Sequence, residues 1–425
     1  NNPLFFEFIL HFWTKIVGIS AFSVRFLPVL FSALTGVVLF EFARKNHSFL
    51  VGVGAALLFT FSDAIILYSH TARTYSMLLL FTSLAMYFLV EVLRTHSKKR
   101  LIFFTIFNAL VIYTHYISPF ILFAEFIIVV LSVKEKKKYY QLILSALSSC
   151  FLASPIIYFF ILRVTGAVSQ GTWVQKPSGL ESIHFMLWKF FNTPLASILT
   201  LVIIIAAIVV YLVRIETKQT LSVSVFGKVT IVWSAMLVFI FCVSFHTPLF
   251  MRRYVLFTVP ALCLLVPYCL SFLFTNIRLK IGVVVLFAGV VTFTASLNKD
   301  NDRNLREMVS YVKKVRATLD KSNVMLFSPA FDDLGIAYYY SPTTFKSADK
   351  KKLKSFFKSE RMFPLLSISQ RPEEELATAK TILFLDGNSN FSHPNNGILT
   401  FLKKHYRVVS KKHFHEVHDV WLFEK

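Results

Sequence analysis

Acidic residues are scarce in the first 297 positions of this 425-residue chain. That stretch holds seven glutamates and a single aspartate, Asp63, against 23 lysines and arginines, whereas the remaining residues hold 15 acidic and 22 basic side chains. The formal net charge of +22 would suit a nucleic-acid partner if it covered one surface. Because the basic residues of the first part stand between apolar runs, we expect no nucleic-acid partner.

Cysteine is also scarce, and this excludes a disulfide scaffold. The four cysteines lie inside apolar runs, where a thiol packs as a small apolar side chain. We therefore predict neither disulfides nor a cysteine metal site, and the cysteines leave the redox compartment open. They are Cys150, Cys242, Cys263 and Cys269.

Apolar residues are abundant, at 55% of the chain, with a mean hydropathy of +0.61. Apolar runs of roughly 20 residues, the length that crosses a bilayer as a helix, recur along the chain. We predict an all-α polytopic membrane domain over 1–297, with about ten spans. The predicted spans are 24–43, 49–68, 75–93, 101–114, 117–133, 140–162, 195–213, 229–247, 254–275 and 281–297.

Two segments of this domain are not simple spans. In 3–17, Glu7, His11 and Lys15 share one helical face, which predicts a helix lying at the membrane interface. Residues 163–194 form the longest predicted outer connection and are a candidate lid over the membrane surface.

The orientation follows from counting Lys and Arg in alternate connections. One set of short loops holds 15 basic residues and the other set holds seven, so we place the first set in the cytoplasm. The domain over 298–425 is then exported, and periplasmic in a Gram-negative bacterium. The 15 residues are Arg44, Lys45, Arg94, Lys98, Lys99, Arg100, Lys134, Lys136, Lys137, Lys138, Arg214, Lys218, Lys228, Arg278 and Lys280.

From residue 299 the pattern changes to short alternating elements, which predicts a small soluble α/β domain. Asp302 is a candidate cap for a helix over 303–319, and Lys350–Lys358 reads as a solvated basic helix face that can also contact anionic lipid. The predicted strands are 324–328, 381–385, 406–409 and 420–423.

The few basic residues of the outer connections are candidates for an anion site, because topology gives no reason to place them there. Arginine in particular binds phosphate with two hydrogen bonds. Snorkelling toward lipid phosphates is the structural alternative for each arginine taken singly. The candidate donor-phosphate and substrate-binding residues are Arg73, Tyr75, His115, Tyr116, Lys176, Arg252, Arg253 and Tyr254.

Three further features have a structural and a functional interpretation. Asp63 and Glu125 lie within predicted spans, where a carboxylate is either hydrogen-bonded structure or a coupling residue of a transporter. His413-Phe-His-Glu-Val-His418 has a metal-like alternation, but we favour a surface strand and predict no metal site there.

Taken together, the outer motifs resemble those of the polytopic GT-C glycosyltransferases, in particular the bacterial group related to protein O-mannosyltransferases and to the lipid A aminoarabinose transferase. The resemblance covers nearly the whole membrane part, and its specificity comes from the ordered set. The matching segments are Asn2-Pro-Leu-Phe-Phe6, Arg25-Phe-Leu-Pro28, Tyr68-Ser-His-Thr-Ala-Arg-Thr-Tyr-Ser76, Tyr113-Thr-His-Tyr116, Trp173-Val-Gln-Lys-Pro177 and Arg253-Tyr254.

The resemblance implies an inverting transfer of a sugar from a polyprenyl-phosphate donor to a lipid, glycan or protein acceptor, at the outer face of a bacterial inner membrane. Two positions depart from the family pattern: Asn2 stands for a histidine and Thr71 for a glutamate. The family's general base is an aspartate before the Pro-Leu element, so we expect the catalytic base upstream of Asn1. Assistance by a divalent metal stays open.

Two other functions remain as alternatives. A secondary transporter or lipid flippase would use Asp63 and Glu125 as coupling residues, but no internal repeat is visible in the sequence. A lipid-linked polysaccharide ligase would share the donor chemistry but not the ordered motif set.

Overall fold

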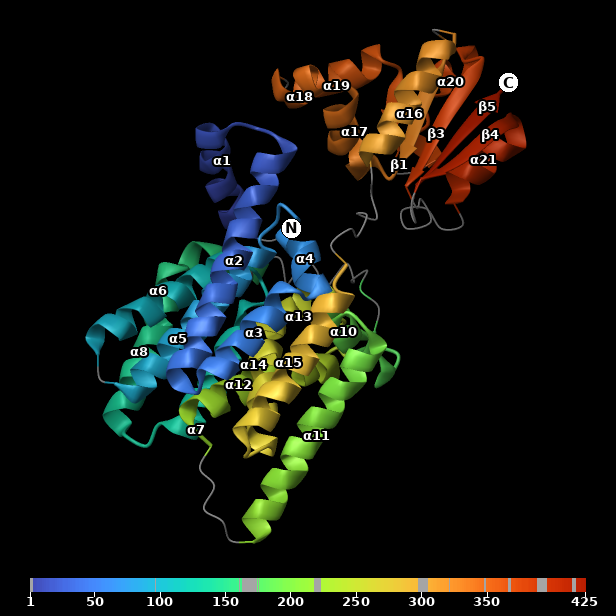
Figure 1. Ribbon diagram of the computed structural model, residues 1–425. Coiled ribbons are helices and arrows are strands. Elements are labelled where there is room, and N and C mark those ends of the chain that lie inside the picture. The colour runs from blue at the N-terminus through green and yellow to red at the C-terminus, as the bar shows by residue number, and fades with distance from the viewer. Residues whose placement is uncertain are drawn as a thin grey trace. The chain divides into compact units, whose positions relative to one another are not determined.

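The chain divides into two compact units, Asn1–Leu297 and Asn298–Lys425. The structure, a computed structural model, is shown in Figure 1, and each unit is described by itself. The described residues are 3–95, 97–159, 161–162, 174, 176–217, 223–296, 305–320, 322–347, 349–365, 368–387, 396–414 and 418–425.

The described part of the first unit is helical, as the apolar runs predicted. Six of its helices are long and apolar enough to cross a membrane, or seven if one bent pair counts as a span, and the shorter α6, α7 and α8 occupy three other predicted spans. The helices are α1 (Phe5–Val17), α2 (Ala21–Asn46), α3 (Phe49–Thr60), α4 (Asp63–Ser69), α5 (Tyr75–Arg94), α6 (Lys98–Thr114), α7 (Ser118–Ser132), α8 (Lys136–Leu152), α10 (Glu181–Phe191), α11 (Pro194–Glu216), α12 (Val225–Val243), α13 (Arg252–Val255), η1 (Leu256–Thr258), α14 (Val259–Leu273) and α15 (Ile277–Thr294).

Helix burial differs strongly within this unit. In its most apolar window α5 is 78% buried, and the segment from α13 through α14 is 83% buried, whereas α11 and α15 are each only 22% buried. The apolar side chains that α11 and α15 leave uncovered suit a hydrocarbon environment. We therefore describe the chain as a multi-pass membrane protein in which α5 and α14 form the centre of the helix bundle.

The sequence predicted one span over 49–68, and the structure breaks it into α3 and α4, which are bent by 60°. Ser62 and Asp63 stand at the break, and both are residue types that favour the first positions of a helix. Asn192, on a distant segment, supplies hydrogen bonds to the backbone there. The predicted span over 140–162 is also interrupted, because α8 ends before a turn at Ala153.

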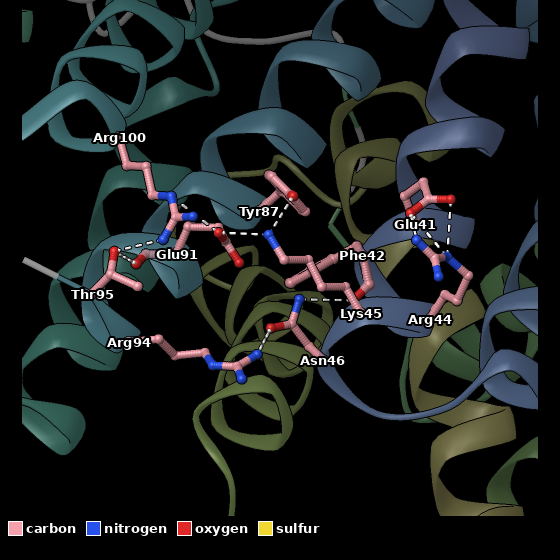
Figure 2. A network of polar contacts seen from close by, with 10 residues as sticks. All are labelled: Glu41, Phe42, Arg44, Lys45, Asn46, Tyr87, Glu91, Arg94, Thr95 and Arg100. Atoms are coloured by element: carbon pink, nitrogen blue, oxygen red, sulfur yellow. Dashed lines mark hydrogen bonds and ion pairs between the residues drawn. The ribbon is translucent and has the colours of Figure 1, made fainter. Parts of the chain in front are cut away.

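Polar contacts join the ends of α2, α5 and α6 (Figure 2). The Glu91 carboxylate on α5 is only 4% exposed and lies 2.7 Å from Lys45 Nζ and 3.2 Å from Arg100 Nε. Lys45 Nζ also donates to the Tyr87 hydroxyl at 3.2 Å. A buried carboxylate is stable only when it is paired and hydrogen-bonded, so two cations from neighbouring helices hold Glu91 in place.

The second unit is a three-layer α/β/α sandwich around a five-stranded sheet of order β2-β1-β3-β5-β4. The β1–β2 and β1–β3 pairs are parallel, and the other two pairs are antiparallel. The strands are β1 (Val324–Ser328), β2 (Met362–Pro364), β3 (Thr381–Gly387), β4 (Arg407–Phe414) and β5 (His418–Glu424).

Alternation of apolar side chains along β1 explains the two helical layers. Met325 and Phe327 face one core with α16 (Leu305–Thr318), α17 (Asp333–Tyr340) and α19 (Lys350–Ser359). Val324 and Leu326 face the other core, with α20 (Glu373–Thr378) and α21 (Gly397–His405). The short helix α18 (Pro342–Ser347) and the 3-10 turns η2 (Ala330–Asp332) and η3 (Ile368–Gln370) complete the unit.

The four predicted strands and the predicted helix over 303–319 are all present, the latter as α16. The sequence missed β2, which is only three residues long. Asp302, the predicted cap of α16, lies outside the described residues.

Candidate functional site

The turn between α4 and α5 begins the site. Thr71 Oγ1 donates to the Leu67 carbonyl at 2.9 Å, and Arg73 N donates to the Thr71 carbonyl at 2.7 Å. The buried Thr74 Oγ1 donates to the Thr114 carbonyl at 2.8 Å and so ties this turn to the end of α6. The arginine in the middle of the turn, Arg73, is exposed, and its guanidinium makes no hydrogen bond or ion pair to the described residues.

Four aromatic rings from separate segments form a continuous row beside this turn. The Tyr68 and Tyr75 ring centroids are 4.9 Å apart, and the Tyr75 and His115 centroids are 5.9 Å apart. The row ends with Tyr254 on α13, whose ring centroid lies 6.0 Å from that of His115. The end of α4, the start of α5, the α6–α7 turn and α13 therefore meet at one place.

Two arginines flank this aromatic row. The Arg252 guanidinium carbon lies 5.8 Å from the centre of the Tyr68 ring, and that of Arg253 lies 5.4 Å from the centre of the Tyr254 ring. Both arginines are partly buried on α13. The π face of an aromatic ring attracts a nearby guanidinium, and arginine is the side chain best suited to bind phosphate. We call Tyr68, Tyr75, His115, Arg252, Arg253 and Tyr254 the aromatic–arginine cluster.

The hydrogen bonding of His115 determines which ring nitrogen carries the proton. Ile117 N–H donates to His115 Nδ1 at 3.1 Å, so Nδ1 is an acceptor and carries no proton. Burial, together with the positive charge of Arg253, lowers the pKa of His115 to about 3, which keeps the imidazole neutral. The one ring proton is then on Nε2, a buried atom without a hydrogen-bond partner among the described residues. His115 therefore presents an uncommitted N–H donor inside the cluster.

Of the residues that the sequence singled out, the structure brings five into this cluster: Tyr75, His115, Arg252, Arg253 and Tyr254. Three others lie outside it as defined. Tyr116 is half-buried in the α6–α7 turn, Arg73 is exposed in the α4–α5 turn, and Lys176 is exposed before α10.

Sequence reasoning did not select Tyr68, although this residue begins the motif that contains Arg73. Its ring lies between that of Tyr75 and the Arg252 guanidinium. The sequence did indicate Tyr68, because Tyr68 and Tyr75 stand on either side of the short polar stretch that separates two apolar runs. The candidate lid over 163–194 is described only in part, since 163–173 and 175 lie outside the described residues.

Asp63 has a structural role in the described residues. Its Oδ1 accepts a hydrogen bond from Ser296 N at 3.0 Å, just beyond α15, and its own N–H donates to Asn192 Oδ1 at 2.7 Å. Asn192 Nδ2 donates to the carbonyls of Phe61 and Val291, each at 2.8 Å. The bonds to Asp63 N and Phe61 O satisfy backbone groups at the α3–α4 break, and those to Val291 O and Ser296 N join the break to the end of α15.

Glu125 is likewise bonded within the bundle. Asn108 Nδ2 on α6 donates to Glu125 Oε2 on α7 at 2.8 Å, and both side chains are buried. This bond joins α6 to α7. It gives Glu125 a packing role that needs no transported ion.

Of the histidines in the 413–418 segment, His413 lies on β4 and His418 on β5, and residues 415–417 are outside the described part. His413 Nδ1 lies 2.7 Å from Asp419 Oδ1, on the neighbouring strand. Among the described residues, no group of three or more His, Cys, Asp or Glu is arranged to hold a metal ion.

The helical fold and the cluster define a polytopic membrane protein with a partly buried cationic site. Its residues 1–159 match the family model described as dolichyl-phosphate-mannose-protein mannosyltransferase. The fold resembles ArnT from Cupriavidus metallidurans in the apo state, with a TM-score of 0.61 and 10% identity over 99% of this chain and 87% of that one. The same protein bound to undecaprenyl phosphate gives a TM-score of 0.54 and 11% identity over the same shares. Comparison with curated protein sequences gives no match.

The family model thus matches the N-terminal part of the chain, and the similarity to ArnT, at 10–11% identity, is a similarity of fold.

Proposed function

We propose that this protein transfers a sugar from a polyprenyl-phosphate donor to a lipid, glycan or protein acceptor. The observation that carries the proposal is the aromatic–arginine cluster, which gathers two guanidiniums and an uncommitted imidazole N–H from distant segments. Two comparisons support the donor class. The matching family model is named for a dolichyl-phosphate-mannose enzyme, and one structural neighbour was solved with undecaprenyl phosphate.

The chemistry needs cations at the donor phosphate. When the bond from the sugar to the phosphate oxygen breaks, negative charge develops on the phosphate, which is the leaving group. Arg252 and Arg253 stabilise that charge, and His115 Nε2–H donates a further hydrogen bond. Arg73 is exposed at the adjacent turn and supplies an additional cation, while Tyr75, Tyr116 and Tyr254 provide hydroxyls.

The acceptor hydroxyl must lose a proton to a base. Asp63 and Glu125, two carboxylates within the predicted spans, bond to Ser296 N and to Asn108 respectively, and neither belongs to the cluster. The cluster as described holds no carboxylate, and we assign the base to no residue of it. Lys176 and the segment around it remain candidates for covering the site.

We also propose that the cluster faces the outside of a bacterial inner membrane and that the C-terminal unit is exported. The distribution of lysine and arginine supports this orientation. The exposed Lys314 on α16 is a suitable labelling position. A Lys314→Cys variant should react with a membrane-impermeant maleimide added to intact spheroplasts, and labelling only after lysis would reverse the orientation.

Binding of undecaprenyl phosphate to the purified protein in detergent tests the donor site without requiring the base. A hydrogen bond to a charged group contributes about 1.5–3 kcal/mol, so Arg252→Ala and Arg253→Ala should each weaken binding by about 10- to 100-fold. Arg278→Ala is the matched control, since Arg278 is an exposed arginine at the start of α15.

The control should bind as the unsubstituted protein does. Equal losses in all three variants would indicate a general charge effect, and unchanged affinity in both cluster variants would exclude the cluster as the phosphate site.

A further inference from the structure

The C-terminal unit contains an open pocket with a volume of about 480 Å³. It lies where α16, the end of α17 and the junction between α19 and β2 meet, and its polar wall includes Lys313, Arg316, Asn323, Tyr340 and Glu360. Pockets of about 300–1,000 Å³ are typical of small-molecule sites. The volume is far larger than a single phosphate ion needs, so a ligand that fills it has an uncharged part attached to its anionic group.

Arg316 is held rigidly in the wall of this pocket. Its side chain is only 10% exposed. Its Nε donates to Asn323 Oδ1 at 2.8 Å, its Nη1 to the Tyr340 hydroxyl at 3.1 Å and its Nη2 to the Glu360 carbonyl at 2.7 Å. A guanidinium has five N–H donors, so these bonds leave one N–H on each terminal nitrogen. A fixed arginine fork with two remaining donors is suited to a phosphate or carboxylate.

The charges around the pocket favour an anion. Lys313, Arg316 and Arg361 line it, against a single acid, Glu360. Lys313 Nζ donates to the Tyr340 carbonyl at 3.0 Å and lies 5.5 Å from the Tyr340 ring centre. The Glu360 carboxylate is 3.9 Å from Arg316 Nη1, so it offsets only part of this positive charge.

Arg361 has a backbone that arginine rarely adopts, with φ of +50°. Its Nη2 donates to the Glu375 carbonyl at 3.0 Å, which anchors the pocket wall to α20. Its Nε is buried and has no hydrogen-bond partner among the described residues. The chain therefore keeps an arginine, at some conformational cost, at a position where glycine is the unstrained choice.

We propose that this pocket binds a phosphorylated saccharide. Lys313 and the two remaining N–H groups of Arg316 take the phosphate, and Tyr340 offers an aromatic surface to the sugar ring. The site goes beyond the proposed function, because it lies in the other unit of the chain and uses no residue of the aromatic–arginine cluster. It gives the C-terminal unit a ligand of its own.

Equilibrium dialysis of the full chain in detergent with radiolabelled glucose 6-phosphate tests this inference, with glucose and inorganic phosphate as competitors. We expect saturable binding that unlabelled glucose 6-phosphate displaces better than inorganic phosphate, and inorganic phosphate better than glucose. The absence of saturable binding at millimolar concentrations would overturn the proposal. Displacement by inorganic phosphate as strong as by the sugar phosphate would overturn the saccharide part of it.

Two neighbouring lysines on α16 provide matched variants, because both are exposed and only Lys313 lines the pocket. Lys313→Gln should weaken binding by about three- to tenfold and Lys314→Gln should leave it unchanged, as expected for one partly exposed charge. Glu360→Gln should strengthen binding, since it removes the only acid in the wall. Equal weakening by both lysine variants, or weaker binding in Glu360→Gln, would contradict the assignment.

Undecaprenyl phosphate binding separates this site from the donor site. It should be unchanged in Lys313→Gln, which also shows that the variant is folded. Loss of both ligands in that variant would refute two independent sites, whereas failure of Arg252→Ala to affect the lipid would leave the saccharide pocket standing.

Discussion

Replacing Asn192 should loosen the membrane unit at the α3–α4 break. The side chain accepts one hydrogen bond from Asp63 N–H and donates two, to the carbonyls of Phe61 and Val291. Hydrogen bonds contribute about 0.5–1.5 kcal/mol each in proteins, and about 0.6 kcal/mol on average where measured between membrane helices. Losing three should lower the free energy of unfolding by about 2–4 kcal/mol, because the freed backbone groups are shielded from water.

The backbone of Asn192 must be separated from its side chain, because its φ of +73° suits asparagine and glycine better than alanine. Asn192→Gly keeps that conformation and removes the three bonds, so it isolates the side-chain contribution. Asn192→Asp keeps the acceptor for Asp63 N–H but places carboxylate oxygens against two carbonyls. We expect Asn192→Asp to be at least as destabilised as Asn192→Gly, and Asn192→Ala to be less stable than Asn192→Gly.

Thermal unfolding of the purified protein in detergent, followed by size-exclusion chromatography after heating, measures the effect. For a unit of this size, Asn1–Leu297, a loss of about 2–4 kcal/mol should lower the midpoint by roughly 3–6 °C. Undecaprenyl phosphate binding should weaken as well, because Tyr68 of the cluster is on α4. A glycine variant with an unchanged midpoint would show that the break does not depend on this side chain.

Two other outcomes can be checked in the same preparations. Glu91→Ala should lower the free energy of unfolding by about 1–3 kcal/mol, because it leaves Lys45 and Arg100 without their shared carboxylate, and the partial exposure of both cations limits the loss. Glu41→Ala, which removes an exposed pair with Arg44, is the control and should leave the thermal midpoint nearly unchanged. His115→Gln should retain more undecaprenyl phosphate affinity than His115→Phe, since glutamine preserves an N–H donor. The pH dependence of binding by His115→Gln between about pH 5 and 8 should parallel that of the unsubstituted protein, because the pKa of His115 is about 3. A transition near pH 6.5 that disappears with His115 would contradict the neutral tautomer.

Much of the fold was predictable because its elements have strong local patterns. Long apolar runs specified the helices of the first unit, and alternation in Val324–Ser328 and Thr381–Leu385 specified two central strands. The α3–α4 break was missed because residues 49–68 are apolar almost throughout, and its stabilising contacts come from Asn192. The strand β2 was missed because three residues carry too little periodicity to distinguish a strand from a turn.

The residues of the candidate site could be predicted from separate motifs, but the contacts between them could not. The arginines of the predicted outer connections and the family resemblance selected Tyr75, His115 and Arg252–Tyr254 before any contact was known. Which rings would touch was not accessible, because the row joins segments more than 100 residues apart through tertiary packing. The tautomer of His115 required the observed bond from Ile117 N–H.

The dependence of the α3–α4 break on distant residues bears on how the chain is made. Asp63 N–H meets its acceptor on Asn192, which is synthesised 129 residues later, and Asp63 Oδ1 meets its donor Ser296 only after 233 residues. During synthesis the break therefore enters the membrane without these partners, and water or the insertion machinery must satisfy its polar groups. The contacts of the bent segment are complete only when α15 has been added, so the final placement of α4, and with it Tyr68, is a late event.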